Sequence, residues 1–215
     1  MSTSVVTIID YGVGNLLSVQ RGFEKCGARV LVTSDPKVIR NAERVVLPGV
    51  GAFPNAMEAL KRLNLIVTLQ ELGESKTPLL AICLGMQLLM DESEEFGITP
   101  GLGLIRGRVV AIPSISTSGE LLKIPHIGWS QLRPRVESQI WGDTLLRDNS
   151  FGDSAYFVHS FMAQPSDIRN QIAYAVYGGH EISAVISRDK ITGCQFHPEK
   201  SGEVGLEILR NFCRD

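Results

Sequence analysis

The first half of the chain alternates short, unbroken apolar runs with segments of helical periodicity, and this alternation restricts the fold more than any other feature. The run Val5–Ile9 stops at an aspartate and a glycine-containing loop, as a buried strand of a parallel sheet does. The segment 15–26 then places apolar residues on one helical face and ends at Gly27. Three further apolar runs repeat the strand pattern, at 29–33, 44–47 and 78–83. The alternation is typical of an α/β fold with a parallel sheet.

The remaining segments complete this prediction. A long helix is expected after the loop Pro48-Gly49-Val50-Gly51, with a buried face at 4-3-4 spacing made by Ala56, Leu60, Leu63 and Val67. Shorter helices are expected at 85–90 and 205–212. Beyond residue 100 the apolar segments are short, strand-like and separated by turn residues. We therefore expect one domain, in which antiparallel strands extend a central, mostly parallel sheet.

Composition and charge exclude several classes of protein. Hydrophobic residues make up 44% of the chain and charged residues 20%, which is ordinary for a globular protein. The 21 Lys and Arg residues nearly balance the 23 Asp and Glu residues, so no basic surface for nucleic acid is indicated. The first residues lack the pattern of a signal peptide, and no apolar run is long enough to span a membrane. We expect a cytoplasmic protein with a small-molecule or protein partner.

Four cysteines are scattered along the chain, at positions 26, 83, 194 and 213, without the spacing of a zinc site. Free thiols in a reducing compartment, with no metal and no cofactor, are the simplest interpretation. Cys83 differs because it joins a buried strand to a helix, where a sharp turn exposes a nucleophile and helix amides favour its thiolate. Buried cysteines also serve as small core residues, so the position alone leaves both interpretations open.

A nucleophilic cysteine needs a base, and His197 is the best placed of the four histidines. It ends an apolar strand and precedes Pro198, which favours an extended conformation at His197. Glu199 follows two residues later, so its carboxylate can lie on the same side and orient the imidazole. Without a cysteine to serve, the pair would be an ordinary loop histidine beside a solvated glutamate.

Acyl transfer also needs hydrogen-bond donors for a developing oxyanion. Gly49, Val50 and Gly51 follow a buried strand, and glycines there allow backbone amides to be aimed closely into a site. A simple strand–helix turn would have the same composition, so this loop supports an acyl-transfer site only together with Cys83 and His197.

Three motifs, in this order, resemble those of the class I, triad-type glutamine amidotransferases: PGVGAF at 48–53, AICLGMQLL at 81–89 and QFHPEKSG at 195–202. Within that family, three more segments resemble the glutaminase subunits of imidazole glycerol phosphate synthases: DYGVGNLLSV at 10–19, PHIGW at 125–129 and YFVHSF at 156–161. The resemblance runs nearly end to end. It implies a single flavodoxin-like α/β domain, residues 1–215, with helices on both faces of the sheet.

The resemblance also implies a mechanism. Cys83 would attack the side-chain amide of L-glutamine, with His197 transferring protons and Glu199 orienting His197. Amides of loop 49–51 would stabilise the oxyanion, and water would release glutamate from a cysteinyl thioester. Glu95 would pair with the substrate ammonium group, although it also fits a solvated acidic stretch. The substrate-binding residues implied are Gly51, Gln87, Glu95, Ser160 and Phe161.

The partner implied by the resemblance is a (β/α)8-barrel synthase subunit, bound as a heterodimer, which uses the ammonia to form imidazole glycerol phosphate and AICAR in histidine biosynthesis. The interface would lie where the catalytic cleft opens. The residues expected there are Asp10, Tyr11, Asn15, Trp129 and Lys200. The glycine-rich loop further predicts that the isolated chain is a poor glutaminase, because the partner would favour the conformation that forms the oxyanion hole.

Three alternatives remain open from the sequence. Ser130 replaces the asparagine usual after the PHIGW motif, which leaves room for a paralogous subunit that supplies ammonia for bacterial surface-sugar synthesis. A non-catalytic flavodoxin-like binding module would use Cys83 only as core. A cysteine hydrolase or peptidase would act without a partner, but Gln87 and Glu95 favour a site for one free amino acid.

Overall fold

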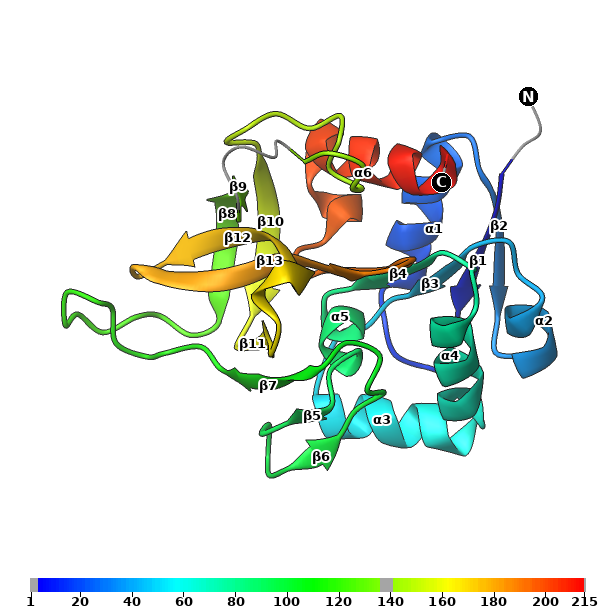
Figure 1. The fold of residues 1–215 in the computed structure, drawn as a ribbon, viewed down its shortest axis with the longest axis horizontal. Coiled ribbons are helices and arrows are strands. Elements are labelled where there is room, and N and C mark those ends of the chain that lie inside the picture. Colours follow the sequence, from blue (N-terminus) through cyan, green and yellow to red (C-terminus); the bar gives the residue numbers. More distant parts are fainter. Residues whose placement is uncertain (1–3, 136–140, 215) are drawn as a thin grey trace.

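An eight-stranded mixed sheet forms the centre of the computed structural model, which describes residues 4–135 and 141–214 (Figure 1). Residues 1–3, 136–140 and 215 of the domain expected from the sequence lie outside the described part. The strand order is β2-β1-β3-β4-β14-β13-β12-β9. In that order the bounds are Arg29–Thr33, Val5–Ile9, Val45–Leu47, Leu79–Ile82, Ile191–Cys194, His180–Arg188, Gln171–Tyr177 and Arg133–Pro134.

The first five strands in this order pair in parallel, and the last three are added antiparallel. The predicted central sheet, mostly parallel and extended by antiparallel strands, is confirmed. The register aligns Leu47 with Ala81, and Ile82 with Cys194. The loops that follow β3, β4 and β14 therefore leave the sheet at the same edge, where α/β proteins place their ligands.

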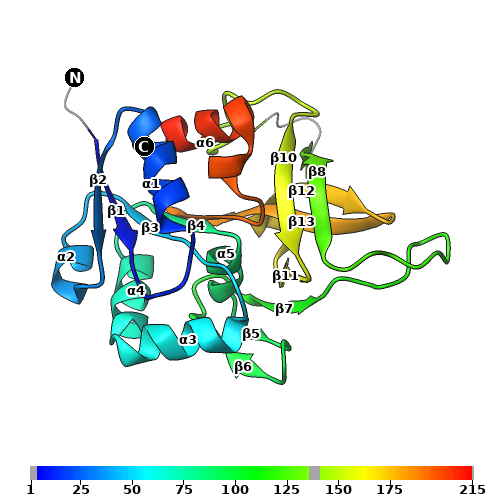
Figure 2. The same cartoon turned by 180° about the vertical axis from the view of Figure 1, so that it is seen from behind.

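Six α-helices cover both faces of this sheet, as predicted (Figures 1 and 2). The helices are α1 (Leu16–Lys25), α2 (Pro36–Arg40), α3 (Phe53–Arg62), α4 (Leu65–Glu74), α5 (Leu84–Leu88) and α6 (Gly202–Arg214). Buried hydrophobic side chains form two large clusters, one on each face of the sheet. Strand β1 contributes to both, because successive side chains of a strand point to opposite faces. Ile8 packs with residues of α1 and α6, whereas Ile9 packs with residues of α3, α4 and α5.

The prediction of a single long helix after loop 48–51 is wrong, because two helices, α3 and α4, take its place. Asn64 adopts a left-handed conformation, φ 57°, which ends the first helix. The break resets the helical phase, so Val67 is 57% exposed rather than part of the buried face. The short helix α2 was also not expected from the sequence.

The segment 155–161, one of the short strand-like segments beyond residue 100, divides at Ser160. Its first half belongs to β10 (Ser154–His159), which pairs with β8 (His126–Gln131) in a two-stranded sheet. Its second half begins β11 (Phe161–Pro165), which joins a four-stranded sheet of order β11-β7-β5-β6. The other strands of that sheet are β7 (Gly107–Ala111), β5 (Glu92–Ser93) and β6 (Thr99–Pro100). In the described residues, no helix has both the length and the apolar character needed to cross a membrane.

A very close backbone contact fixes the start of α5. A Cβ atom on Gly85 would lie 2.0 Å from the carbonyl oxygen of Leu47 at the end of β3. Only glycine allows this approach, because the obstacle is backbone rather than the tip of a flexible side chain.

We therefore expect Gly85→Ala to lower the free energy of unfolding by at least about 2 kcal/mol, the cost of overpacking a rigid site, as measured by urea denaturation. Gly73→Ala, within α4, is the control. The one clash of its added Cβ would be with the tip of the Leu104 side chain, 2.4 Å away, which can move, and alanine favours a helix. Equal stabilities of the two variants would contradict the importance of the Gly85 contact.

Candidate active site

The sulfur-bearing turn at Cys83 has the geometry expected of a nucleophile. Cys83 connects β4 to α5 with φ 55° and ψ −112°, a conformation that is costly for a residue with a side chain. Its amide donates to the carbonyl oxygen of Cys194 at 2.7 Å, which ties the turn to the neighbouring strand β14. The residue is buried but lines a pocket. The structure therefore places the thiol at a strained turn beside a cavity.

His197 and Glu199 form the second part of the site. Nδ1 of His197 lies 2.8 Å from Oε1 of Glu199, and both side chains are buried. Ser201 holds the backbone of this turn, because its hydroxyl donates to the His197 carbonyl oxygen at 2.7 Å. In the described part of the chain, Nε2 of His197 has no hydrogen-bond partner. That nitrogen is therefore available to Cys83, which lines the same pocket.

The charge balance at His197 favours its protonated form. Burial alone would lower the pKa of this imidazole, but the Cys83 sulfur and the Glu199 carboxylate outweigh burial and raise the pKa of His197 to about 10. The three residues, brought together from two distant segments, can thus hold a sulfur nucleophile beside an imidazolium that carries a transferable proton.

Residues 49–51, the loop predicted to form the oxyanion hole and called the oxyanion loop below, lie beside Cys83 and occupy a hydrogen-bond donor next to it. The carbonyl oxygen of Gly49 accepts from the amide of Leu84 at 3.3 Å. The amide after a nucleophile is a common oxyanion donor, and here it is occupied. Because the peptide bond is planar and trans, the amide of Val50 points away from the Gly49 carbonyl. Rotation of the Gly49–Val50 peptide would release the Leu84 amide and reverse the direction of the Val50 N–H.

A pocket of about 390 Å³ opens in front of Cys83. All five residues expected to bind substrate line it: Gly51, Gln87, Glu95, Ser160 and Phe161. Glu95 is buried while Glu92 and Glu94 are exposed, so it is distinct from a solvated acidic stretch. One carboxylate oxygen, Oε2, accepts from the amide of Phe53 at 2.7 Å. The glutamate is thereby fixed at the pocket wall, where it can meet a cation.

Gln195 is a site residue that the sequence analysis missed. Gln87 donates through Nε2 to the Phe161 carbonyl oxygen at 2.9 Å and to Oε1 of Gln195 at 3.1 Å. Since Phe161 offers only an acceptor there, both amide orientations are determined, and Nε2 of Gln195 is directed to Sγ of Cys83 at 3.9 Å. A polar residue two positions before His197 in an extended strand lies on the same side, a signal that would have identified it.

A second chain of hydrogen bonds reaches the same Phe161 carbonyl oxygen. Nδ1 of His159 contacts it at 2.8 Å and must donate, so Nε2 of His159 accepts from Nδ1 of His126 at 3.1 Å. Nε2 of His126 then accepts from the Ser130 hydroxyl at 3.0 Å. Burial, which dominates, lowers the pKa of His159 to about 4, so this ring is neutral at physiological pH. Two chains of polar side chains thus fix the wall at Phe161.

Comparison with known proteins assigns the family. The family model described as "Glutamine amidotransferase class-I" matches residues 7–215. The chain belongs to the class I glutamine amidotransferases. Imidazole glycerol phosphate synthase subunit HisH 1 of Legionella pneumophila (strain Lens) is 51% identical over 97% of this chain and 98% of the relative. The subunit HisH of Syntrophotalea carbinolica is 46% identical over the same shares.

Solved structures of low sequence identity share the amidotransferase fold. PurLQS from Thermotoga maritima has a TM-score of 0.69 and 16% identity, covering 99% of each chain. A glutamine amidotransferase from the same organism has a TM-score of 0.60 and 16% identity, covering 95% of this chain and 80% of the other. These similarities concern the fold alone.

The residues expected at the partner interface of the amidotransferase differ in exposure. Trp129 is 59% exposed, Asn15 and Lys200 are exposed, and Asp10 is partly so. Tyr11 is different, because only 1% of it is exposed and its hydroxyl donates to the Pro48 carbonyl oxygen. The expectation that Tyr11 lies at a surface is therefore wrong in this structure. The aromatic ring packs into the core instead.

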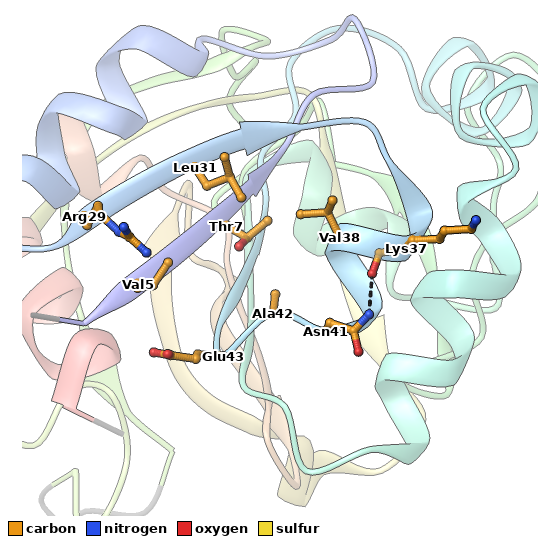
Figure 3. Close-up of a pocket in the computed structure, with 9 residues that line it drawn as sticks. All are labelled: Val5, Thr7, Arg29, Leu31, Lys37, Val38, Asn41, Ala42 and Glu43. Carbon is orange, nitrogen blue, oxygen red and sulfur yellow. Dashed lines mark hydrogen bonds between the residues drawn. The ribbon is translucent and has the colours of Figure 1, made fainter.

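Another hollow of the amidotransferase, of about 490 Å³, lies between α2 and the starts of β1 and β2 (Figure 3). Its nine lining residues include neither a cysteine nor a histidine, and Nδ2 of Asn41 is engaged by the Lys37 carbonyl oxygen. It holds neither a thiol nor an imidazole, so the pocket at Cys83 is the candidate active site.

The charge balance at His197 gives a prediction about its titration. Cys83→Ala removes one of the two groups that favour the imidazolium, so the proton should leave at lower pH and the pKa of His197 should fall. NMR titration of the histidine rings measures this shift. Cys213→Ala, at the far end of α6, is the control and should leave the pKa of His197 unchanged. Identical titrations in the two variants would contradict an interaction between the sulfur and the imidazole.

Gln195 gives a second prediction. Gln195→Met keeps the shape of the side chain but removes its donor to Sγ, so alkylation of Cys83 by iodoacetamide should slow about tenfold, the usual weight of a hydrogen bond to a charged group. Gln171→Met is the control, because Gln171 is also buried and donates through Nε2, but to Ser183 in the neighbouring strand β13. Equal alkylation rates in both variants would show that Gln195 does not act on the sulfur.

Proposed function

We propose that this chain is the glutaminase subunit of an imidazole glycerol phosphate synthase. It would hydrolyse L-glutamine to glutamate and deliver ammonia to a synthase subunit, which forms imidazole glycerol phosphate and AICAR in histidine biosynthesis. The observation that carries the proposal is the convergence of Cys83, His197 and a carboxylate-lined pocket, in a chain 51% identical to a HisH subunit over 97% of its length.

In the first half of the reaction, the Cys83 thiolate attacks the side-chain carbonyl carbon of glutamine and forms a carbon–sulfur bond. The substrate is held by Glu95, which pairs with its ammonium group, and by the wall at Ser160 and Phe161. As the tetrahedral intermediate collapses, the carbon–nitrogen bond breaks and the His197 imidazolium gives its proton to the departing ammonia.

In the second half, neutral His197 removes a proton from water, which attacks the glutamyl thioester. The carbon–sulfur bond breaks, glutamate leaves, and the thiolate–imidazolium pair is restored. Glu199 keeps the imidazole in the tautomer that both steps need, because its carboxylate accepts from Nδ1.

The blocked oxyanion loop supports a dependence on the partner. Negative charge on the substrate oxygen needs donors, but the Gly49 carbonyl oxygen occupies the Leu84 amide in this conformation. A partner that prefers the rotated peptide would shift the population towards the active form. Glutamine would then be hydrolysed only when the acceptor of the ammonia is ready.

The partner is inferred to be a (β/α)8-barrel synthase subunit, bound as a heterodimer over the mouth of the pocket. Lys200 is exposed and lines the pocket, and Trp129 is exposed on β8, the strand that follows the pocket residue Pro125. As a subunit of a biosynthetic enzyme, the chain is expected in the cytoplasm. Ser130 departs from the usual motif, but its hydroxyl is hydrogen-bonded to Nε2 of His126. The substitution therefore does not by itself favour a paralogous pathway.

Co-purification with the natural synthase partner tests the proposal, with glutamine hydrolysis measured for the isolated chain and for the complex with its phosphoribosyl acceptor. The isolated chain should be at least about 100-fold slower, because loss of an oxyanion donor costs this much. Cys83→Ala should abolish hydrolysis in the complex, while Cys213→Ala, distant from the pocket, should retain it.

Other outcomes identify the alternatives. Full activity of the isolated chain would contradict the gated loop and favour a hydrolase that acts alone. Unchanged behaviour of Cys83→Ala in every assay would favour a non-catalytic binding module. Activation only by a sugar acceptor and its synthase would assign the chain to surface-sugar biosynthesis.

A further inference from the structure

The connection between β1 and α1, residues 10–15, touches the oxyanion loop at two points. The Tyr11 hydroxyl donates to the carbonyl oxygen of Pro48 at 2.7 Å. Gly14 packs against the Pro48 ring, since a Cβ atom there would lie 3.5 Å from Cβ of Pro48. This connection and the oxyanion loop follow neighbouring parallel strands, β1 and β3, so they lie at the same edge of the sheet.

The Tyr11 hydroxyl lies next to Gly49, whose carbonyl group belongs to the peptide that must rotate. A Cβ atom on Gly49 would be only 2.7 Å from this hydroxyl oxygen and 2.9 Å from the Gly85 amide. Gly49 is therefore packed closely against both the tyrosine hydroxyl and the first turn of α5. Tyr11 fixes the peptide before Gly49, and the Leu84 amide fixes the peptide after it.

The hydroxyl can serve only as a neutral hydrogen-bond donor. Tyr11 is 1% exposed, and burial, with a smaller effect of the Cys83 sulfur, raises its pKa. Its bond to Pro48 is the one hydrogen bond of this side chain within the described residues. A buried carbonyl oxygen that loses its donor is destabilised, so the Pro48 contact favours the present form of the loop.

Both ends of the connection are anchored, and its middle reaches the surface. The Asp10 carboxylate accepts from the Gly12 amide at 3.0 Å, and Asn15 caps α1 by accepting from the Ser18 amide. Gly12 is exposed and has φ 82°, a conformation that glycine adopts readily. A protein bound at Asp10 and Asn15 would therefore press on the segment that carries Tyr11.

We propose that Tyr11 is a positioning residue that holds the oxyanion loop in its blocked form, and that a partner docked on residues 10–15 releases the loop by displacing the Tyr11 hydroxyl from Pro48. The inference rests on the proposed function and assigns part of its regulation to one hydrogen bond. Tyr11 does not line the pocket, so it acts through the loop rather than on glutamine.

Tyr11→Phe tests the inference, because it removes only the hydroxyl. Glutamine hydrolysis by the isolated subunit should become about three to ten times faster, the factor expected for loss of an ordinary hydrogen bond that favours the blocked form. The rate of the activated complex and the KM for glutamine should remain close to those of the wild type. The activation ratio should fall by the same factor.

Tyr177→Phe is the matched control, since the Tyr177 hydroxyl also donates to a backbone carbonyl oxygen, that of Lys123, away from the oxyanion loop. It should leave the activation ratio unchanged. A second readout is amide hydrogen exchange. In Tyr11→Phe, exchange should rise at the Leu84 amide but not at the amide of Leu80 in β4, which distinguishes release of the loop from general destabilisation.

Each outcome has a separate meaning. A wild-type complex that does not hydrolyse glutamine would overturn the proposed function and this inference together. An active wild type, with Tyr11→Phe indistinguishable from Tyr177→Phe, would overturn the inference alone. A fall in both the isolated and the activated rates, with exchange raised throughout β4, would also overturn it, because Tyr11 would then be only structural.

Discussion

The contact between Gly85 and the carbonyl oxygen of Leu47 is the constraint on which the active site depends. It brings the first turn of α5 directly against the end of β3, at a distance where a Cβ atom would lie 2.0 Å from the oxygen. The chain must turn sharply at Cys83 to enter the helix there, and the Leu84 amide is brought to the Gly49 carbonyl. The Cys83 turn and the oxyanion loop are thus positioned by one packing contact. A movement of either one should therefore displace the other.

The polar groups around the pocket are organised by a second constraint, the carbonyl oxygen of Phe161. It accepts from Gln87 and His159, and this determines the orientation of every amide and imidazole connected to them. The environments of the two pocket histidines differ as a result. The pKa of His159 is lowered to about 4, mainly by burial, whereas the Cys83 sulfur and Glu199 raise the pKa of His197 to about 10 against burial. Of these two rings, only the His197 imidazolium can donate a proton in the proposed reaction, whereas His159 stays neutral.

The sequence predicted what depends on local pattern and missed what depends on distant pairing. The limits of β1 and β2 agree with the apolar runs. For β1 the reason is burial on both faces, which makes a strand continuously apolar in sequence, whereas β2 lies at the sheet edge and is largely exposed. The division at Ser160 could not be read from the run 155–161, since each half pairs with a different sheet. The helix break at Asn64 depends on a backbone conformation that periodicity does not report. Cys83 and His197, singled out from the sequence, line one pocket, and Glu199 is hydrogen-bonded to His197. Tyr11 was expected at the partner interface because its motif, not its packing, suggested that role, but it is buried.

The energetics of the oxyanion loop show that no single hydrogen bond can gate the reaction alone. A hydrogen bond such as those made by Tyr11 and Leu84 contributes about 0.5 to 1.5 kcal/mol. Shifting a two-state loop from about 1% to 99% active requires about 5.5 kcal/mol of differential binding, more than either bond supplies. A partner must therefore act on the loop through several contacts at once, and a connection that touches Pro48 through both Tyr11 and Gly14 provides such a route. Loss of one contact should raise the basal rate only modestly, while leaving most of the gating intact.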